Sequence, residues 1–271
     1  MHPSLSRLNK YINLKLNKII YQIIKLITYK QRLKRLKDYL IMRFLVFDTE
    51  TTGLPQTKFI SPSTLHQWPH IVQFSYIIYD SSLNDIVESK DYIVKLPQSI
   101  SISDDSTKIH GITNEISATK GVPINEILNE FFYFLRGVDK LIGHNIEFDV
   151  NMIKVALLRL INSDSLTKEQ LKIYKYDFHY LTNYKHISCT LKDSIQFCNI
   201  QLIDKNGKPY LKYPKLIELH EKLFKNSLTN LHNSFNDILV TLRCFMKLKH
   251  DIDLNDDCNS FKKYSNLIGL T

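Results

Sequence analysis

Residues 44–53 read FLVFDTETTG, an apolar run that ends on two carboxylates. If the run is a buried strand, Asp48 and Glu50 stand two positions apart and face the same way. Two carboxylates in a poorly solvated place raise each other's pKa, which is unfavourable unless a cation lies between them. Oxygen atoms are the ligands that Mg²⁺ prefers. The stretch therefore predicts a core strand that ends in one half of a metal site.

From Arg43 onward, β-rich runs alternate with segments of helical periodicity. The β-rich runs fall at 43–50, 71–79, 85–96 and 140–143, and the helical segments fall at 125–135, 146–160, 214–224 and 235–248. Three consecutive strands with short connections predict an antiparallel meander, to which later strands add in parallel. Asn206-Gly207 predicts a hairpin with a two-residue turn within 200–212. This order predicts an α/β fold with a mixed sheet flanked by helices.

Positive charge is concentrated at the start of the chain. Residues 1–42 hold ten of the 36 basic residues but only one of the 27 acidic residues, Asp38, so this segment carries +9. The remaining 26 bases and 26 acids balance, so the charge of the rest of the chain is no evidence for nucleic-acid binding. Apolar residues repeat with helical periodicity in 1–42, but its lysines interrupt any run long enough to span a membrane.

Four interpretations of residues 1–42 stay open: a transit peptide that targets an organelle, a membrane-surface helix, a basic arm for nucleic acid or a partner, and a segment absent from the working protein if Met42 is the start. We divide the chain into this N-terminal extension, a folded domain at 43–250 with a polar insertion at 161–186, and a C-terminal tail at 251–271. The four cysteines lack CxxC spacing, which predicts reduced thiols in an intracellular compartment, cytoplasmic or nuclear.

Two further acids stand at the starts of predicted helices, and each has a simple structural explanation. Asp149 lies in the first turn of the helix at 146–160, where Asn145 is placed to cap it and an acid complements the helix dipole. Asp237 fits the last position of a capping box that begins at Ser234. Their combination with the pair in residues 44–53 changes this interpretation, because four carboxylates are enough to hold two divalent ions.

A histidine accompanies the last acid. His232 precedes Asp237 by five positions, which are about 140° apart on a helix, so the two cannot share a helical face. We therefore expect His232 on the loop before the helix and Asp237 in its first turn. An imidazole titrates near neutral pH and is suited to take a proton beside the metals.

The three segments resemble the motifs of the DnaQ-like family, the DEDD 3′–5′ exonucleases. FDTETTG is similar to the first motif, HNIEFD at 144–149 to the second, and the H-x-x-x-x-D that runs from His232 to Asp237 to the third. The sister group has Tyr four residues before the last Asp, where this chain has Asn233, so the histidine form, DEDDh, is indicated. IHGIT at 109–113 resembles a family segment between the first two motifs. The resemblance covers roughly 43–249 and implies an RNase H-like fold; the polar stretch at 161–186 and His232-Asn233-Ser234 depart from the pattern.

The resemblance also implies a two-metal mechanism with Mg²⁺, for which Mn²⁺ substitutes. Asp48 would bridge both ions, Glu50 and Asp237 would help to hold the ion that carries the attacking water, and Asp149 would hold the other ion mainly through water. His232 would act as the general base. The expected reaction hydrolyses the terminal phosphodiester bond and releases a 5′-mononucleotide.

The expected substrate is a single-stranded 3′ end, with DNA favoured over RNA, because a terminal nucleotide must be unpaired to reach the metals. The residues expected to meet it are Thr51, Thr52, Leu54, His144 and Phe148, although plain packing explains Phe148 equally well. Three alternatives stay open: an exoribonuclease, a non-catalytic nucleic-acid-binding module, and a polymerase accessory with a replication or repair partner. Five ionisable residues at these spacings argue against a pure binder.

Overall fold

The computed structural model of the chain describes residues 25, 42–226, 228 and 232–267. The chain divides into two units, residues 1–41 and 42–271. Apart from Lys25 and Met42, the extension predicted at 1–42 lies outside the described residues, so its helix stays a prediction. None of the described helices combines the length and the apolar character needed to cross a membrane.

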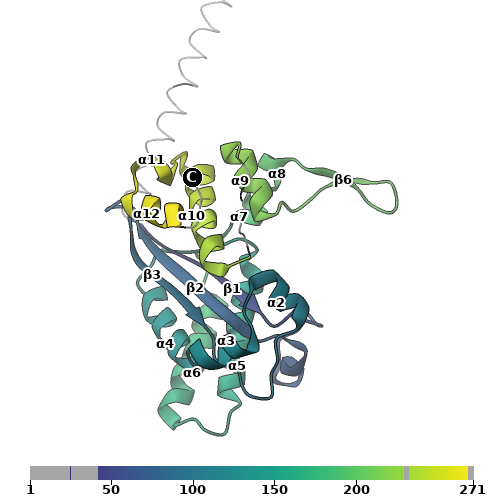
Figure 1. The fold of residues 1–271 in the computed structure, drawn as a ribbon, viewed down its shortest axis with the longest axis vertical. Coiled ribbons are helices and arrows are strands. Elements are labelled where there is room, and N and C mark those ends of the chain that lie inside the picture. Colours follow the sequence, from purple (N-terminus) through teal and green to yellow (C-terminus); the bar gives the residue numbers. More distant parts are fainter. Residues whose placement is uncertain (1–24, 26–41, 227, 229–231, 268–271) are drawn as a thin grey trace, which may run out of the picture. The chain divides into compact units, whose positions relative to one another are not determined.

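The core of the second unit is a five-stranded mixed sheet (Figure 1). Its strands are β1 (Arg43–Thr51), β2 (Ile71–Asp80), β3 (Asp85–Ile93), β4 (Lys140–Gly143) and β5 (Ile187–Cys189), in the order β3-β2-β1-β4-β5. The first three strands pair antiparallel, and β4 and β5 add in parallel on the other side of β1. This arrangement confirms the predicted mixed α/β sheet.

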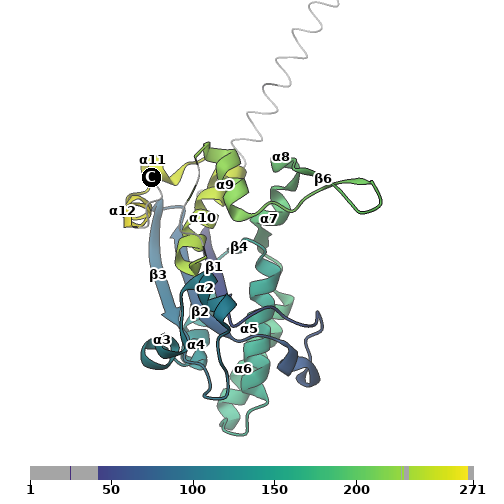
Figure 2. The same ribbon diagram turned by 45° about the vertical axis from the view of Figure 1, so that its right-hand side comes forward.

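Helices pack on both faces of the sheet (Figures 1 and 2). They comprise the 3-10 helix η1 (Pro62–Gln67) and the α-helices α2 (Asp104–His110), α3 (Asn114–Lys120), α4 (Ile124–Leu135), α5 (Ile146–Ile161), α6 (Lys168–Asn183), α7 (Thr190–Asp193), α8 (Ile195–Cys198), α9 (Leu216–Phe224), α10 (Ser234–His250), α11 (Leu254–Asp257) and α12 (Asn259–Leu267).

Strand β1 separates two apolar layers because its side chains alternate between the faces of the sheet. Phe47 packs against Phe131 of α4, with ring centroids 5.4 Å apart. Phe44 points to the other face and meets Phe245 of α10 at 5.3 Å. All four residues of the run from Phe44 to Phe47 are fully buried. Asp48 and Glu50 continue the alternation on the side of Phe44, which is the face that α10 covers.

Two segments that the sequence analysis set apart are packed into this unit. The predicted polar insertion at 161–186 forms α6, whose Tyr174 and Leu181 are buried in the main core, while Asp177 pairs with Arg136. The described part of the predicted tail, residues 251–267, forms α11 and α12, and Phe261 is completely buried. Residues 161–186 looked polar because α6 presents only one apolar stripe to the core, and the rest of the helix faces solvent.

The predicted hairpin is present as β6 (Gln201–Ile203) and β7 (Pro209–Leu211), but its turn is longer than two residues. Ile203 pairs with Pro209, so the turn spans 204–208. A two-residue turn at Asn206-Gly207 would set Lys205 directly opposite Lys208, and like charges in that position are destabilising. The Asp204 carboxylate closes the longer turn instead, by accepting hydrogen bonds from the amides of residues 206 and 208 at 2.8 and 2.9 Å.

Candidate metal centre

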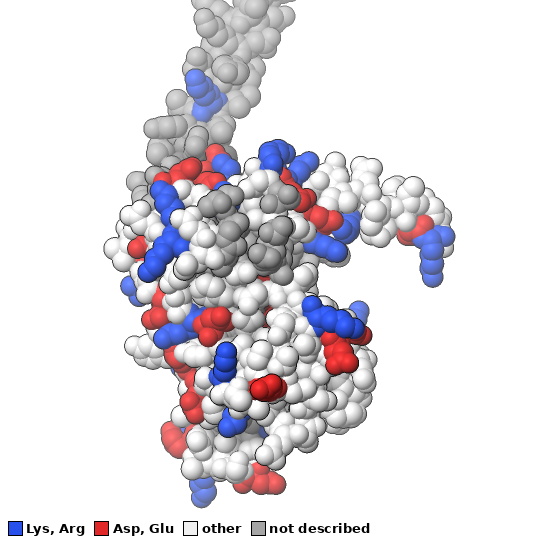
Figure 3. Space-filling model, in the orientation of Figure 1, with Lys and Arg blue, Asp and Glu red and all other residues white. Residues whose placement is uncertain are grey.

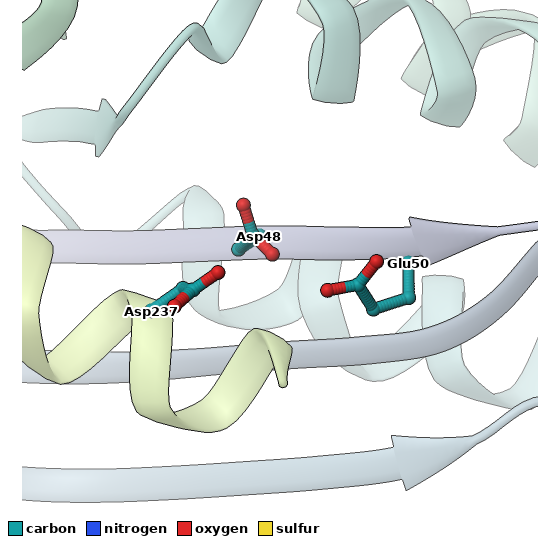
Figure 4. A group of neighbouring side chains, drawn as sticks. All are labelled: Asp48, Glu50 and Asp237. Carbon is teal, nitrogen blue, oxygen red and sulfur yellow. The ribbon is translucent and has the colours of Figure 1, made fainter. Parts of the chain in front are cut away.

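Two carboxylates of the site project from the end of β1 on the face that α10 covers (Figure 4). Asp48 lies opposite Ser75 of β2, and Glu50 lies opposite Gln73. The pairing register shifts immediately after Glu50, which is the irregularity expected of a β-bulge. Bulges re-aim side chains next to functional sites. Asp48 and Glu50 are both partly exposed, so the end of the strand is open to solvent.

The third carboxylate comes from the first turn of α10, whose start differs from the prediction. Asn233 is the N-cap residue, and its side-chain oxygen accepts hydrogen bonds from the amides of Phe235 and Asn236. The predicted cap at Ser234 is wrong, because this residue is already inside the helix and its hydroxyl contacts Ser75 of β2. Asp237 is therefore released from capping and points toward β1 (Figure 4).

A buried polar network fixes the start of α10 against the sheet. The Ser234 amide donates to the side-chain oxygen of Gln73 at 3.2 Å. The Gln73 side-chain nitrogen in turn donates to Asp91 of β3 at 2.8 Å, and the Ser75 hydroxyl donates to the same Asp91 oxygen at 2.7 Å. Gln73 and Ser75 are also the strand partners of Glu50 and Asp48, respectively. The same network therefore fixes the position of α10 relative to β1.

The carboxylates of Asp48, Glu50 and Asp237 converge. Each offers an oxygen atom, and these oxygens all lie within 4.8 Å of one another. Burial, reinforced by the charges of the neighbouring acids, raises the pKa of Asp48 well above its ordinary range and that of Glu50 to about 8. Burial also raises the pKa of Asp237 to about 7, although a hydrogen bond from the backbone of His232 acts to lower this pKa. The site therefore holds more negative charge than its surroundings stabilise.

These residues suit a divalent cation. The oxygen Oδ1 of Asp237 is buried and accepts no hydrogen bond from the described part of the chain. A buried acceptor of this kind is costly unless a partner is supplied from outside. A hard cation with oxygen ligands supplies that partner and removes the repulsion among the three acids.

Asp149 approaches the same place from α5 but is held differently. Strand β4 pairs with β1 only as far as Val46, so the edge of β1 is open beyond that residue. Thr49 uses this edge: its amide and its hydroxyl both donate to Asp149 Oδ1, at 3.1 and 2.7 Å. Burial raises the pKa of Asp149 to about 7, although the two bonds from Thr49 lower it. Asp149 is not one of the three converging carboxylates, but its charge has the largest effect of any neighbour on Asp48.

The start of α5 also differs from the prediction. Asn145 occupies the N-cap position, but its side chain makes no capping hydrogen bond, and its φ of 63° is left-handed. Asparagine tolerates this conformation better than most residues. The preceding His144 is held by both ring nitrogens, with Nδ1 2.9 Å from the Thr190 hydroxyl and Nε2 3.1 Å from the carbonyl oxygen of Pro214. Burial lowers the pKa of His144 to about 4, so the ring is neutral.

His232 lies outside the group of converging carboxylates. It precedes α10, its side chain is exposed, and its backbone has a left-handed φ of 77°. Asp237 follows in the first turn of the helix, as the spacing of the two residues predicts. The role of His232 as a general base stays a prediction.

The residues expected to meet substrate fall into two groups. Thr51, the last residue of β1, and Thr52 use their hydroxyls for bonds to the backbone: Thr51 donates to the Gly53 carbonyl at 2.7 Å, and Thr52 accepts from the His70 amide at 3.0 Å. Leu54 is 83% exposed beside them, and Phe148 is half-buried against the main core. Thr49 was missed, although it stands between the two predicted ligands of β1. The only signal in the sequence was a hydroxyl side chain between the two acids.

Comparisons with known proteins identify similarity to exonucleases and to subunits of a DNA polymerase. A sequence model described as an exonuclease matches residues 45–245. The chain is 29% identical to the DNA polymerase III subunit epsilon of Pasteurella multocida over 128 residues, 46% of each protein. It is 26% identical to the subunit of the same name from Buchnera aphidicola subsp. Acyrthosiphon pisum over 229 residues, 79% of this chain and 85% of that protein. It spans less than half the length of the first two curated relatives that it matches.

Solved structures share the fold. A crystal structure of E. coli Exonuclease I in complex with a dT13 oligonucleotide superposes with a TM-score of 0.51 at 19% identity, covering 78% of this chain and 42% of that one. A 3′-exonuclease structure concerned with recognition of a histone mRNA stem-loop superposes with a TM-score of 0.50 at 13% identity, covering 86% of this chain and 74% of that one. At these identities the likeness concerns the fold alone, and it confirms the RNase H-like architecture.

Proposed function

This chain belongs to the RNase T exonuclease family, and on that premise we propose that it is a metal-dependent 3′–5′ exonuclease that shortens single-stranded DNA from its 3′ end. The observation that carries the proposal is the convergence of the carboxylates of Asp48, Glu50 and Asp237. Three acids brought so close together, each with a raised pKa, are unfavourable for folding alone and are explained by a ligand of opposite charge.

The proposed ligand is Mg²⁺, two ions in the working enzyme, with Mn²⁺ as a substitute. Asp48, Glu50 and Asp237 would hold them, with Asp149 contributing from the edge of β1. When bound, the ions stabilise the negative charge that develops on the phosphate and make water a stronger nucleophile. The protein contributes the placement of these residues. The hydrogen-bond network around Gln73 places Asp48, Glu50 and Asp237, and Thr49 places Asp149.

The remaining steps fall to this chain's own side chains. His232 accepts a proton from the attacking water at an imidazole nitrogen. Its exposed position before α10 leaves the side chain free to approach a substrate. The loop after Glu50 receives the terminal nucleotide, and the exposed Leu54 provides an apolar surface there. The product is a 5′-mononucleotide, and the shortened strand keeps its 3′-hydroxyl.

DNA is the proposed substrate because the curated relatives are subunits of a DNA polymerase. The same relatives support a polymerase or another replication or repair protein as a partner. An exoribonuclease is the second candidate, since a structure concerned with a histone mRNA stem-loop shares the fold. Free thiols at all four cysteines support a reducing, intracellular compartment.

One assay tests these proposals together. Matched DNA and RNA oligonucleotides, labelled at the 5′ end, are incubated with the full chain and Mg²⁺, Mn²⁺ or a chelator. The expected result is stepwise shortening of the single-stranded DNA from its 3′ end, which needs a metal and is lost in Asp237→Asn. Faster shortening of the RNA would reassign the substrate. Binding without hydrolysis of either strand would make the protein a non-catalytic binding module.

A further inference from the structure

The hairpin of β6 and β7 projects away from the rest of its unit (Figures 1 and 2). Its strands are exposed apart from a half-buried Leu211, and the cross-strand neighbours Leu202 and Tyr210 are 41% and 49% exposed. A two-stranded ribbon gains little stability by itself, and exposed apolar side chains that no core requires often mark a contact surface. The exposed apolar side chains of the hairpin therefore indicate a contact surface.

The ribbon nevertheless has a defined shape. Besides the two bonds that the Asp204 carboxylate accepts, the backbones of Asp204 and Lys208 pair, and the Gly207 amide donates to the Asp204 carbonyl at 3.0 Å. Gly207 has a φ of 80°, which glycine adopts without strain. The turn thus holds the strands in one register, and side chains two positions apart share a face.

One face of the ribbon combines positive charge with an aromatic ring. Lys208, Tyr210 and Lys212 alternate along β7 and its continuation, and Leu202 is the cross-strand neighbour of Tyr210. Residues 200–215 contain four lysines and one acid, Asp204, whereas the chain from Arg43 onward is neutral as a whole. Figure 3 shows lysines at the free end of the hairpin. Within the described residues, Lys205 and Lys208 take part in none of the ion pairs, while Lys212 pairs with Glu218.

The root of the hairpin contacts the segment that leads into α5, the helix that carries Asp149. Pro214, three residues after β7, accepts a hydrogen bond through its carbonyl from His144 Nε2 at 3.1 Å. His144 follows β4 and stands two residues before α5, the helix that carries Asp149. Lys192 of α7, which leads toward the hairpin, pairs with Glu147 in the first turn of the same helix at 2.8 Å. The ribbon therefore starts beside the segment that supplies the fourth acid.

We propose that the face formed by Leu202, Lys208, Tyr210 and Lys212, together with Lys205 at the turn, binds the part of a single-stranded nucleic acid that lies upstream of its 3′ end. This inference rests on the proposed exonuclease function and extends its site outward. Lysines contact phosphates without reading sequence, and an exposed tyrosine offers a surface on which any base stacks. An acidic peptide would satisfy the lysines but would leave the aromatic and apolar side chains between them unused.

The test compares the full chain with two variants, Lys205→Ala/Lys208→Ala and Tyr210→Ala. Binding of a 5′-labelled single strand of about 20 nucleotides is followed by fluorescence anisotropy in a chelator, at several salt concentrations. The double lysine variant should lower the slope of log K against log salt by about 1.4, because each phosphate contact on a single strand contributes about 0.7. Tyr210→Ala should weaken binding about tenfold with little change of slope.

A kinetic comparison separates the hairpin from the metal centre. With Mg²⁺, both variants should raise KM for the long strand about tenfold and leave kcat unchanged. Neither variant should alter hydrolysis of a trinucleotide, which lacks the upstream nucleotides that the ribbon is proposed to bind. Lys168→Ala/Lys172→Ala on α6 and Tyr133→Ala on α4 are the matched controls, because these side chains are also exposed. Circular dichroism verifies that every variant is folded.

The proposal is overturned if the hairpin variants match the controls in affinity, salt slope and KM for the long strand. That outcome would leave the ribbon as a surface for a protein. If wild-type protein hydrolyses neither substrate, the proposed function fails, but the anisotropy comparison in a chelator still decides whether the hairpin binds a single strand.

Discussion

Thr49 donates two hydrogen bonds to a single oxygen of Asp149, one from its amide at 3.1 Å and one from its hydroxyl at 2.7 Å. Both residues are buried, with 6% and 2% of their surface exposed. The bonds exist because β4 ends before β1 does, which leaves the edge of β1 open at Thr49. The position at which β4 ends thus determines where Asp149 of α5 is held.

Thr49→Val should therefore impair the site without removing any acid. The variant keeps the shape of threonine and the amide bond but loses the hydroxyl donor, so the pKa of Asp149 should rise further. Loss of an outer partner of a metal ligand typically costs 10- to 100-fold in affinity or activity, and we expect a loss of about tenfold in kcat. Thr49→Ser restores the donor and should recover most of the rate. Equal rates in the valine and serine variants would show that the hydroxyl has no positioning role.

Asp237→Asn should abolish hydrolysis and stabilise the metal-free protein at pH 8. The substitution removes one of three converging charges and keeps the size of the side chain, so it relieves repulsion. Hydrolysis of a labelled single strand reports activity, and urea unfolding in a chelator reports the free energy of unfolding. Asp105→Asn is the control, because its side chain is 91% exposed and lies on α2. Destabilisation by Asp237→Asn would mean that the acids attract a group of the chain and do not repel one another.

The stability of the metal-free protein should fall as pH rises from about 4 to about 8. Burial and neighbouring charges place the folded-state pKa of Glu50 at about 8 and that of Asp237 at about 7, above their ordinary values of 4.5 and 3.8. In this range the folded state binds more protons than the unfolded state, so the free energy of unfolding decreases with pH. Saturating Mg²⁺ should flatten the dependence, because the ions compete with those protons. Urea unfolding across this range, with Mg²⁺ and with a chelator, measures both curves, and a metal-free protein that gains stability toward pH 8 would contradict the assignment.

The elements that carry the site were predictable because they depend on burial along one strand or one helix. Phe44–Phe47 is apolar on both faces and continues into alternating acids, a pattern typical of a central strand that ends at a polar edge. Helix α5 likewise follows from sustained apolar periodicity. The convergence of Asp48, Glu50 and Asp237 was inferred from motif spacing, because no local property of the chain brings residues 48 and 237 together.

The helix starts were harder to predict because the deciding contacts are distant in sequence. Asn233 and Ser234 are both good caps, and the choice between them is made by Gln73 and Ser75, which bind Ser234 from β2. The short helices α2 and α3 escaped prediction for a different reason. Ser103 and Thr113 cap them properly, but seven residues are too few to show a periodicity.

His232→Ala tests the remaining part of the site, the proton acceptor. The imidazole is exposed on the segment before α10 and is separate from the three converging acids. We therefore expect kcat to fall by roughly 10²- to 10⁴-fold, as for loss of a general base, while the affinity for Mn²⁺ stays within about twofold of wild type. His179→Ala, at an exposed histidine of α6, should alter neither quantity. Mn²⁺ titration followed by electron paramagnetic resonance measures the affinity. A collapse of Mn²⁺ binding in His232→Ala would make this residue a ligand, and an unchanged kcat would assign the proton to another group.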